Sequence, residues 1–205
     1  MKGKFPLTVA MLAGILLITQ TLFGIENLIA PSTNLQFPSE ITSNIDGKEV
    51  ALHATGVATR SKFFVNVYSI AHYMRHPVHG KRSYVFEEIL RDNQPKEVVL
   101  NWVRRVDLEQ MRDGFSDSIQ RVLRYSPANI DEEIEQFLAL FGKDIQSGDI
   151  HKIRWIPGGK IEVEVNGEFI GAVENPEFAK ALWSVWFGPK GVVSRNRLIS
   201  LVKAN

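Results

Sequence analysis

The segment TGVATRSKFFVNVYSIAHYM, residues 55–74, has the composition of a β-strand but carries a cation near its start. Valine, phenylalanine and tyrosine favour extended structure because their side chains pack well on a pleated surface. Successive side chains of a strand point to opposite faces, so a single strand would place Val67 and Ala71 on an apolar face and Arg60 and Tyr68 on a mixed face. An arginine at a strand end is most often a solvated surface charge, so composition alone assigns no function to Arg60.

The composition of the whole chain indicates one domain without disulfides. The 205 residues are 44% hydrophobic, which is enough for one core, whereas two full domains would be crowded. The sequence contains no cysteine, which excludes disulfides, thiolate nucleophiles and cysteine-based zinc sites. Lysine and arginine number 24 against 23 aspartate and glutamate. Because this balance is close to neutral, no nucleic-acid partner is expected.

The first 24 residues have the pattern of a secretory signal. Two lysines precede an apolar run from Phe5 to about Ile18, which predicts an exported, periplasmic protein. A small-x-small cleavage site is hard to find, so the alternative is an uncleaved segment that anchors the protein to the inner membrane, although the run is short for a bilayer span. The expected division of the chain is a signal peptide or anchor in residues 1–24, a linker in residues 25–37 and a folded domain in residues 38–205.

Two stretches in the middle of the chain have helical periodicity. From Asp107 to about Tyr125, apolar residues recur at three- and four-residue steps, and Asp107 with Gln110 resembles a capping box. A second helix is expected from Asn129, its cap, with a stripe that runs to Ile145. Together they predict a layer of amphipathic helices.

The other segments alternate with the period of strands. Glycine after aspartate, asparagine or glycine suits a two-residue hairpin turn, because these residues tolerate positive φ. Residues 96–103 read as a central strand, and helices are expected after Asn175-Pro176 and over residues 194–202. The predicted fold class is therefore α+β, an antiparallel sheet with a helical layer on one face. The expected turns are Asp46-Gly47, Gly158-Gly159 and Asn166-Gly167.

Residue clusters typical of catalysis or metal binding are weak. His72, His76 and His79 have helical spacing, but Pro77 breaks a helix there and no acidic ligand lies among them. The sequence has no G-x-S-x-G motif, and its Gly-Gly pair leads into a strand instead of the helix that a phosphate loop needs. We therefore predict no catalytic residue, no metal and no cofactor.

Three segments together resemble a known family. Residues 56–73 read as G-x-x-x-R-x-K-F-F-x-x-V-Y-x-x-A-x-Y, the stretch PKEVVLNWVRRVDLEQMRDGF covers residues 95–115, and the end of the chain contains W-F-G at residues 186–188. These motifs are similar to those of the chalcone isomerase-like proteins, especially their bacterial exported members. The resemblance covers residues 36–203.

The resemblance implies an open-faced β-sandwich, in which a curved antiparallel sheet and a helical layer enclose a pocket. The family contains isomerases, fatty-acid-binding proteins and non-catalytic members. Arg60 matches the arginine that faces the pocket in both enzymes and binders, and the fatty-acid-binding branch uses an arginine with a tyrosine, here Tyr68, to hold a carboxylate. The enzymes have threonine where this chain has Tyr68. They also carry a tyrosine and an asparagine that are absent from the matching positions of the helix over residues 107–125.

These departures favour an exported, non-catalytic protein that binds a small apolar or amphipathic ligand, such as a fatty acid. One alternative is an isomerase or lyase in which Arg60 polarises an oxyanion. The other is a structural or partner-binding periplasmic module in which Arg60 forms a salt bridge. Membrane association is expected, if at all, through the N-terminal segment. The residues expected to bind the ligand are Arg60, Tyr68, Ser184, Phe64, Phe115 and Trp186.

The spacing of the proposed anchor pair sets a geometric condition. Along a straight strand, the eight-residue separation of Arg60 and Tyr68 spans roughly 26 Å, which is too far for one ligand group. The two side chains can meet only if the chain folds back near Ser61 to Phe64, where the sequence has no strong turn pair. On a straight strand, Arg60 would stand alone or pair with an acid from elsewhere.

Overall fold

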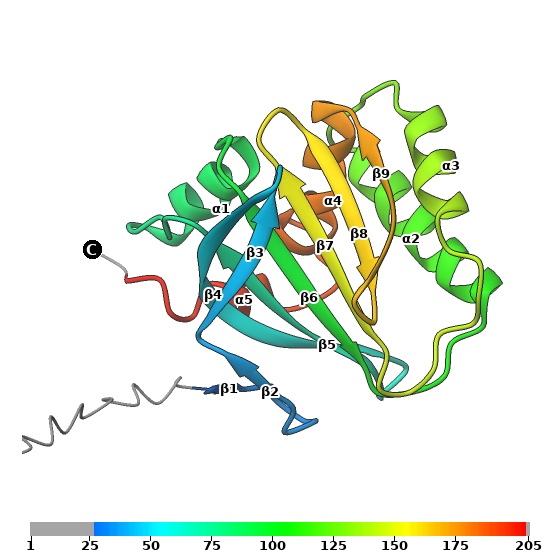
Figure 1. Ribbon diagram of the computed structural model, residues 1–205, viewed down its shortest axis with the longest axis horizontal. Helices are drawn as coiled ribbons and strands as arrows, with labels where there is room; N and C mark the ends of the chain where they lie inside the picture. The colour runs from blue at the N-terminus through cyan, green and yellow to red at the C-terminus, as the bar shows by residue number, and fades with distance from the viewer. Residues whose placement is uncertain (1–26, 204–205) are drawn as a thin grey trace, which may run out of the picture.

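A seven-stranded antiparallel sheet in the order β3-β4-β5-β6-β7-β8-β9 forms the centre of the molecule (Figure 1). The computed structural model describes residues 27–203, so the expected signal or anchor in residues 1–24 lies outside the described residues. Every strand pairs with its neighbours in sequence, which makes the whole sheet a meander. Its strands are β3 (Glu40–Ile45), β4 (Lys48–Lys62), β5 (Val65–Met74), β6 (Lys96–Trp102), β7 (Ile150–Ile156), β8 (Lys160–Val165) and β9 (Glu168–Glu174).

Three of its tight turns are those predicted from local sequence. Asp46 and Gly47, at φ 49° and 81°, join β3 to β4. Gly158 and Gly159 follow Pro157 in the connection from β7 to β8, and Asn166-Gly167 joins β8 to β9; these four residues again have positive φ. These residue types accept the left-handed region at little cost, so the local sequence sets these turns.

A fourth turn divides the segment 55–74 into two strands. Phe63 and Phe64, at φ 51° and 64°, form the two-residue connection between β4 and β5. The chain therefore folds back within the segment, and Arg60 pairs directly with Tyr68. A register shift then leaves Val67 as an extra residue between the pairs Arg60–Tyr68 and Ser61–Asn66. The strict alternation expected for one strand is thus wrong, because a turn and a bulge interrupt it.

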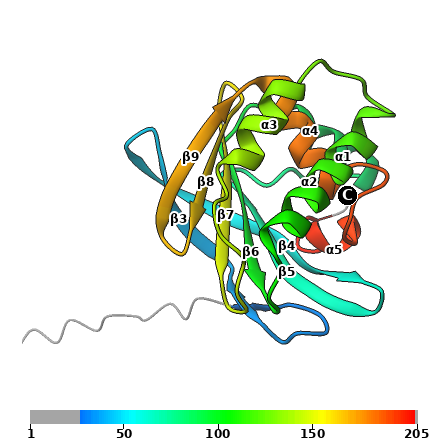
Figure 2. The ribbon, with the colours of Figure 1, turned by 90° about the vertical axis from the view of Figure 1, so that its right-hand side faces the viewer.

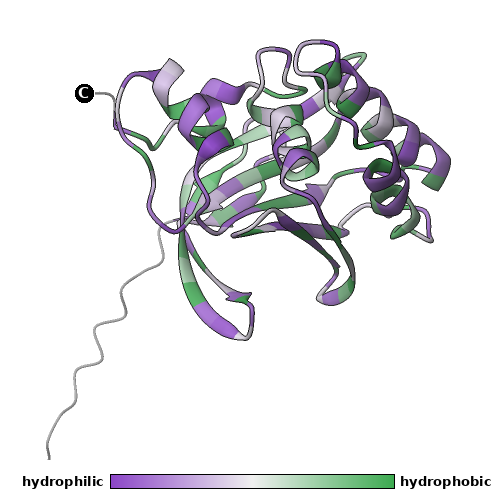
Figure 3. Ribbon diagram, turned by 90° about the horizontal axis from the view of Figure 1, so that it is seen from above, coloured by the Kyte–Doolittle hydropathy of each residue, from purple (hydrophilic) through white to green (hydrophobic). Residues whose placement is uncertain are grey.

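Helices cover one face of the sheet, as the fold-class prediction requires (Figure 2). Hydrophobic stretches of the strands run beneath the helices, and the outward-facing turns of the helices are largely hydrophilic (Figure 3). Within residues 27–203, no helix has the length and apolar character needed to cross a membrane. The helices are α1 (Arg82–Arg91), α2 (Leu108–Leu123), α3 (Asp131–Ala139), α4 (Pro176–Phe187) and α5 (Arg195–Leu198).

Helix α4 forms the centre of this layer. Asn175 caps it as predicted, since its side chain accepts hydrogen bonds from the backbone N–H groups of Glu177 (2.8 Å) and Phe178 (3.2 Å). Its side chains from Phe178 to Phe187 are buried with the single exception of Lys180. This burial places Trp183 and Trp186 in the main core between sheet and helices.

Other helix ends differ from the predictions. The side chain of Asp107 makes no capping bond, and Asp144 from a later loop accepts the N–H of Leu108 at 3.0 Å instead. Helix α3 starts at Asp131 without a side-chain cap from Asn129, and it ends at Ala139. Helix α5 has only four residues, and α1 is a helix that the sequence analysis did not predict.

The opposite face of the sheet holds a second, smaller core. β1 (Asn27–Ile29) and β2 (Gln36–Pro38) pair with each other, so the described part of the expected linker contains a small sheet. Ala30 and Phe37 from this segment pack with side chains of β4 and β5. The expected linker therefore belongs to the folded unit. The buried members from the main sheet are Leu52, Ala54, Val57, Ala71 and Tyr73.

The sheet curls strongly toward this second core. The Lys160 ammonium on β8 contacts the Asp46 carboxylate at 2.7 Å, although Asp46 lies in the β3–β4 turn. Ser43 of β3 donates a hydrogen bond of 2.6 Å to Glu97 of β6, two strands beyond its own partner. Contacts between strands so far apart in the order require a half-barrel shape. This shape carries the turn end of the β4–β5 hairpin toward the helical side (Figure 2).

Candidate ligand-binding pocket

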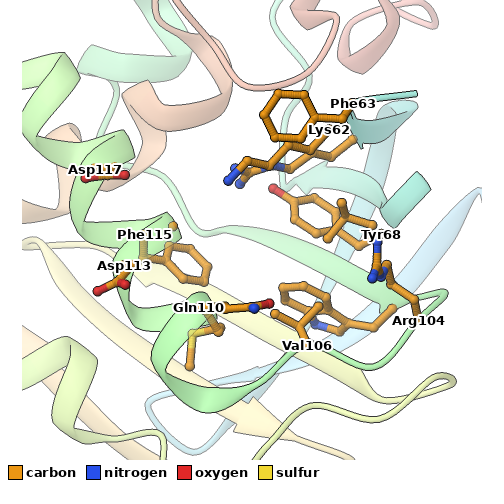
Figure 4. A pocket seen from close by; sticks show the side chains of 14 residues that line it. Lys62, Phe63, Tyr68, Arg104, Val106, Gln110, Asp113, Phe115 and Asp117 are labelled. Atoms are coloured by element: carbon orange, nitrogen blue, oxygen red, sulfur yellow. The ribbon is translucent and has the colours of Figure 1, made fainter. Parts of the chain in front are cut away.

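A pocket lies between the β4–β5 hairpin, the end of β6 and helix α2 (Figure 4). Its volume of about 510 Å³ is within the range of small-molecule sites. The hairpin contributes Arg60, Lys62, Phe63, Val67 and Tyr68, the β6 end contributes Trp102, Arg104 and Val106, and α2 contributes Gln110, Met111, Asp113, Gly114, Phe115 and Asp117.

The pocket has an apolar interior and a charged rim. Buried Tyr68, Trp102, Met111 and Phe115 form the interior. The rim carries three cations on the strand side, and two exposed acids on α2 face them across the opening. In residues 27–203, no ion pair within 4.0 Å involves any of these five side chains. Their charges are thus available to a ligand. The rim cations are Arg60, Lys62 and Arg104, and the acids are Asp113 and Asp117.

Arg60 and Tyr68 share one side of the pocket. Cross-strand partners point to the same face, and the guanidinium carbon of Arg60 lies 5.7 Å from the centre of the Tyr68 ring. This distance is within the range of a cation–π contact. The geometric condition for a shared ligand group is therefore met, because the chain folds back at Phe63-Phe64.

The Tyr68 hydroxyl is held in place with its proton unused. Trp186 Nε1 donates to this oxygen at 3.0 Å, and the Trp102 and Tyr68 rings pack in a T-shaped arrangement with centroids 4.9 Å apart. Because the oxygen acts as the acceptor in the bond with Trp186, its own O–H proton remains to be donated. Among the described residues, no acceptor for that proton lies within hydrogen-bond distance. The hydroxyl can therefore donate to a ligand oxygen.

The structure brings together only some of the residues predicted from sequence. Arg60, Tyr68 and Phe115 line the pocket. Trp186 is buried behind it and contacts it through the Tyr68 hydroxyl. Ser184 and Phe64 neither line the pocket nor contact a residue through which they would act on it in the way that Trp186 does. Ser184 donates to the Lys180 carbonyl at 2.7 Å within α4, whereas Phe64 is fully exposed at the hairpin turn.

Sequence reasoning missed several lining residues. Arg104 follows the predicted strand over residues 96–103, and Trp102 is directly opposite Tyr68 in the β5–β6 register. Once the strand order is known, that register identifies Trp102, and Arg104 follows two residues later. From the sequence alone, the only signal was the unusual pair Arg104-Arg105 at the end of an apolar strand.

A neutral histidine lies behind the pocket wall. His151 packs against Trp102 and Phe141, with ring centroids 5.4 Å and 5.7 Å away. Burial lowers the pKa of His151 to about 4, although Asp149 opposes the shift, so its imidazole is neutral at pH 7. Nδ1 of His151 and Nε1 of Trp102 have no hydrogen-bond partner in the described part of the chain. This wall of the pocket is therefore aromatic and uncharged.

The titratable side chains of the pocket lie mostly at its rim. Its buried surface offers one hydroxyl, and its acids are exposed at the rim. A general base that works on a bound substrate should lie within hydrogen-bond reach of the reacting atom. Over residues 27–203, no group of three or more histidine, aspartate or glutamate side chains is arranged to hold a metal ion.

Comparisons with known proteins agree with this architecture. The structure is similar to the crystal structure of a fatty-acid binding protein from Arabidopsis thaliana, with a TM-score of 0.72 and 17% sequence identity over 85% of this chain and 96% of that one. At this identity the likeness shows the fold, a curled seven-stranded antiparallel half-barrel packed with helices. No curated protein sequence matches the chain. The model of the family described as "Chalcone isomerase-like" matches residues 33–196, and the protein therefore belongs to the chalcone isomerase-like family.

Proposed function

We propose that the protein binds an apolar molecule that carries a carboxylate, such as a fatty acid, without transforming it. The observation that carries this proposal is the pair of Arg60 and Tyr68 at the side of a largely apolar pocket. The guanidinium offers a planar set of donors that matches a carboxylate, and the Tyr68 hydroxyl adds another donor. The carboxylate would lie at the rim, and the apolar chain would extend between Trp102, Met111 and Phe115.

The rim charges support a ligand with an anionic end. Arg60 is only half-buried, and neither it nor Lys62 or Arg104 has an acidic partner within the described residues. A structural arginine would be expected to have such a partner, because an ion pair offsets the cost of partial burial. An incoming carboxylate could take that place.

The structural relative supports the choice of ligand class. That protein is a fatty-acid binding protein, and the structural similarity extends over nearly all of its length and most of this chain. The low identity leaves the ligand of this protein as our proposal. The isomerase alternative has less support, because the only buried titratable side chain that lines the pocket is Tyr68.

A displacement titration tests the proposal. A fluorescent fatty acid is bound to the purified protein and then competed with palmitate and with hexadecanol, its alcohol of equal length. We expect palmitate to displace the probe at a concentration about tenfold or more below that of the alcohol, because only the carboxylate forms charge-assisted bonds. Equal displacement by both would contradict carboxylate recognition, and no probe binding would contradict lipid binding.

We also propose that the protein acts outside the cytoplasm, on the pattern of residues 1–24 alone. Cell fractionation with intact-mass measurement of the protein tests this location. A periplasmic or membrane-bound protein is the expected result, and a full-length protein in the cytoplasmic fraction would contradict it.

A further inference from the structure

The β4–β5 turn exposes three consecutive apolar side chains. Phe63, Phe64 and Val65 are 84%, 105% and 47% exposed. The other exposed large hydrophobic residues within residues 27–203 occur singly along the sequence. The hairpin also projects beyond the rest of the sheet, as the cyan ribbon in Figure 2 shows. An exposed apolar group of this kind marks an interaction site more often than chance.

The backbone at this turn gives no local reason for phenylalanine. Both Phe63 and Phe64 have left-handed φ, a region that bulky residues rarely adopt. The other two-residue turns of the same sheet use Asp46-Gly47 and Asn166-Gly167, and the three-residue β7–β8 connection places Gly158 and Gly159 at its positive-φ positions. Stability would favour the same residue types here. Two largely exposed aromatic residues that do not suit the turn therefore point to a contact outside the chain.

The base of the turn is positively charged. Lys62 lies beside the exposed rings, with Nζ 5.8 Å from the centre of Phe63, and Arg60 and Arg104 stand close by on the same side of the pocket. The acids that face this group, Asp113 and Asp117, lie across the opening on α2. The projecting end of the hairpin thus combines aromatic rings at its tip with cations behind them.

We propose that this hairpin tip inserts into the surface of an anionic lipid bilayer. Aromatic rings partition into the headgroup boundary of a bilayer, and nearby lysine and arginine side chains are attracted to anionic lipids. A bilayer accepts a small wedge without shape complementarity. A stable protein partner, in contrast, would need an interface much larger than a two-residue tip provides.

Docking at the tip places the pocket opening at the membrane. Phe63 and Lys62 belong to the lining of the pocket as well as to the turn. An apolar ligand could then pass between bilayer and pocket with little exposure to water. This transfer role rests on the proposed function, whereas the docking itself does not.

The absence of cysteine allows a clean test on the full chain. Val65→Cys carries an environment-sensitive fluorophore next to both intact phenylalanines, and Tyr84→Cys carries the same label on α1, beyond the far end of β5. Vesicles are made of equimolar phosphatidylcholine and phosphatidylglycerol, with nitroxide-labelled lipid as quencher. We expect a blue shift and quenching at residue 65 and neither at residue 84. Vesicle-bound protein whose label at residue 65 remains in water would overturn the proposal, because another segment would then hold the membrane.

A second variant separates docking from ligand binding. Phe64→Gly suits the turn and changes a side chain outside the pocket lining, so the protein should fold and keep its affinity for the fluorescent fatty acid in solution. We expect its vesicle affinity to fall at least about tenfold, because one exposed aromatic ring no longer enters the bilayer. Unchanged vesicle affinity would contradict the docking proposal. A protein that never binds fatty acid would contradict the proposed function and leave the vesicle result intact.

Discussion

Arg60 and Tyr68 lie directly opposite each other on β4 and β5, with the guanidinium carbon 5.7 Å from the centre of the phenol ring. They are neighbours because the chain reverses at Phe63-Phe64. The half-buried cation and the buried hydroxyl then face the same pocket.

Removing the Arg60 guanidinium should weaken binding of a fatty-acid probe. We expect Arg60→Ala to lower the affinity about ten- to hundredfold, the range for losing a hydrogen bond to a charged group. The affinity of Arg60→Lys should lie between those of the wild type and Arg60→Ala, because lysine keeps the charge and lacks the planar set of donors. The matched control is Arg75→Ala, an exposed arginine just beyond the far end of β5. Fluorescence titration measures all four proteins, and equal affinities would exclude Arg60 as the anchor.

Tyr68→Phe should reduce both stability and affinity. The substitution removes the acceptor of the Trp186 Nε1–H bond and leaves that buried donor unpaired, at a cost of about 1–3 kcal/mol. It also removes the O–H group that we propose donates a hydrogen bond to the ligand carboxylate. Urea unfolding and probe titration measure the two effects. The control is Tyr125→Phe, the same substitution at an exposed position. A stable variant with full affinity would show that the Trp186–Tyr68 bond has neither role.

The buried histidine behind the pocket should make the protein less stable in acid. Burial lowers the pKa of His151 to about 4, while an unfolded chain keeps an ordinary value near 6.5. Between these values the unfolded state binds more protons, so the free energy of unfolding falls as pH decreases from about 6.5 to about 4, by on the order of 3 kcal/mol. Burial also lowers the pKa of His72, which adds in the same direction.

Denaturant unfolding across this pH range measures the effect. His151→Phe should flatten the dependence, whereas His76→Asn, at an exposed position, should leave it unchanged. An NMR titration of the native protein provides a check that does not depend on a variant. An ordinary pKa for His151 in that titration would rule out the explanation.

On the opposite face of the sheet, a buried ion pair should be costly to break. Glu97 is almost completely buried, and its carboxylate contacts Arg154 Nε at 3.1 Å and accepts a hydrogen bond from Ser43 at 2.6 Å. Arg154→Met leaves this charge without its partner and also removes the contacts of Arg154 with Glu162 and Glu164, so we expect a loss of about 3–5 kcal/mol in the free energy of unfolding. Adding Glu97→Gln should recover part of that loss, and this recovery distinguishes an unpaired charge from lost packing. Lys160→Met, which breaks more exposed pairs with Asp46 and Glu162, should cost less than about 1 kcal/mol.

The sequence predicts those parts of the fold that local chemistry determines. Asp46-Gly47 and Asn166-Gly167 form turns because their residues tolerate positive φ, and Asn175 caps α4 because its side chain reaches the first free N–H groups. The turn at Phe63-Phe64 has no such signal, since phenylalanine is typical of strands. It forms because β5 pairs with β4 along the whole length of β5, an effect that no residue of the turn sets alone.

The candidate site could be predicted only in part, because strand pairing brings its residues together. The family resemblance identified Arg60 and Tyr68, but their proximity depends on the hairpin. Arg104 lies beside them because β6 pairs with β5 and its last residue, Trp102, is opposite Tyr68. Phe64 was expected in the pocket, but its position in the turn directs it to solvent instead.

The most direct test of the central claim is mass spectrometry of small molecules extracted from the full-length protein, from Arg60→Ala and from Arg75→Ala, all purified in the same way. We predict an apolar molecule with a carboxylate in the wild-type and Arg75→Ala preparations, and its depletion from Arg60→Ala. The same molecules in equal amounts in all three preparations, or none in any, would contradict the assignment of Arg60 as the carboxylate anchor of a lipid-binding pocket.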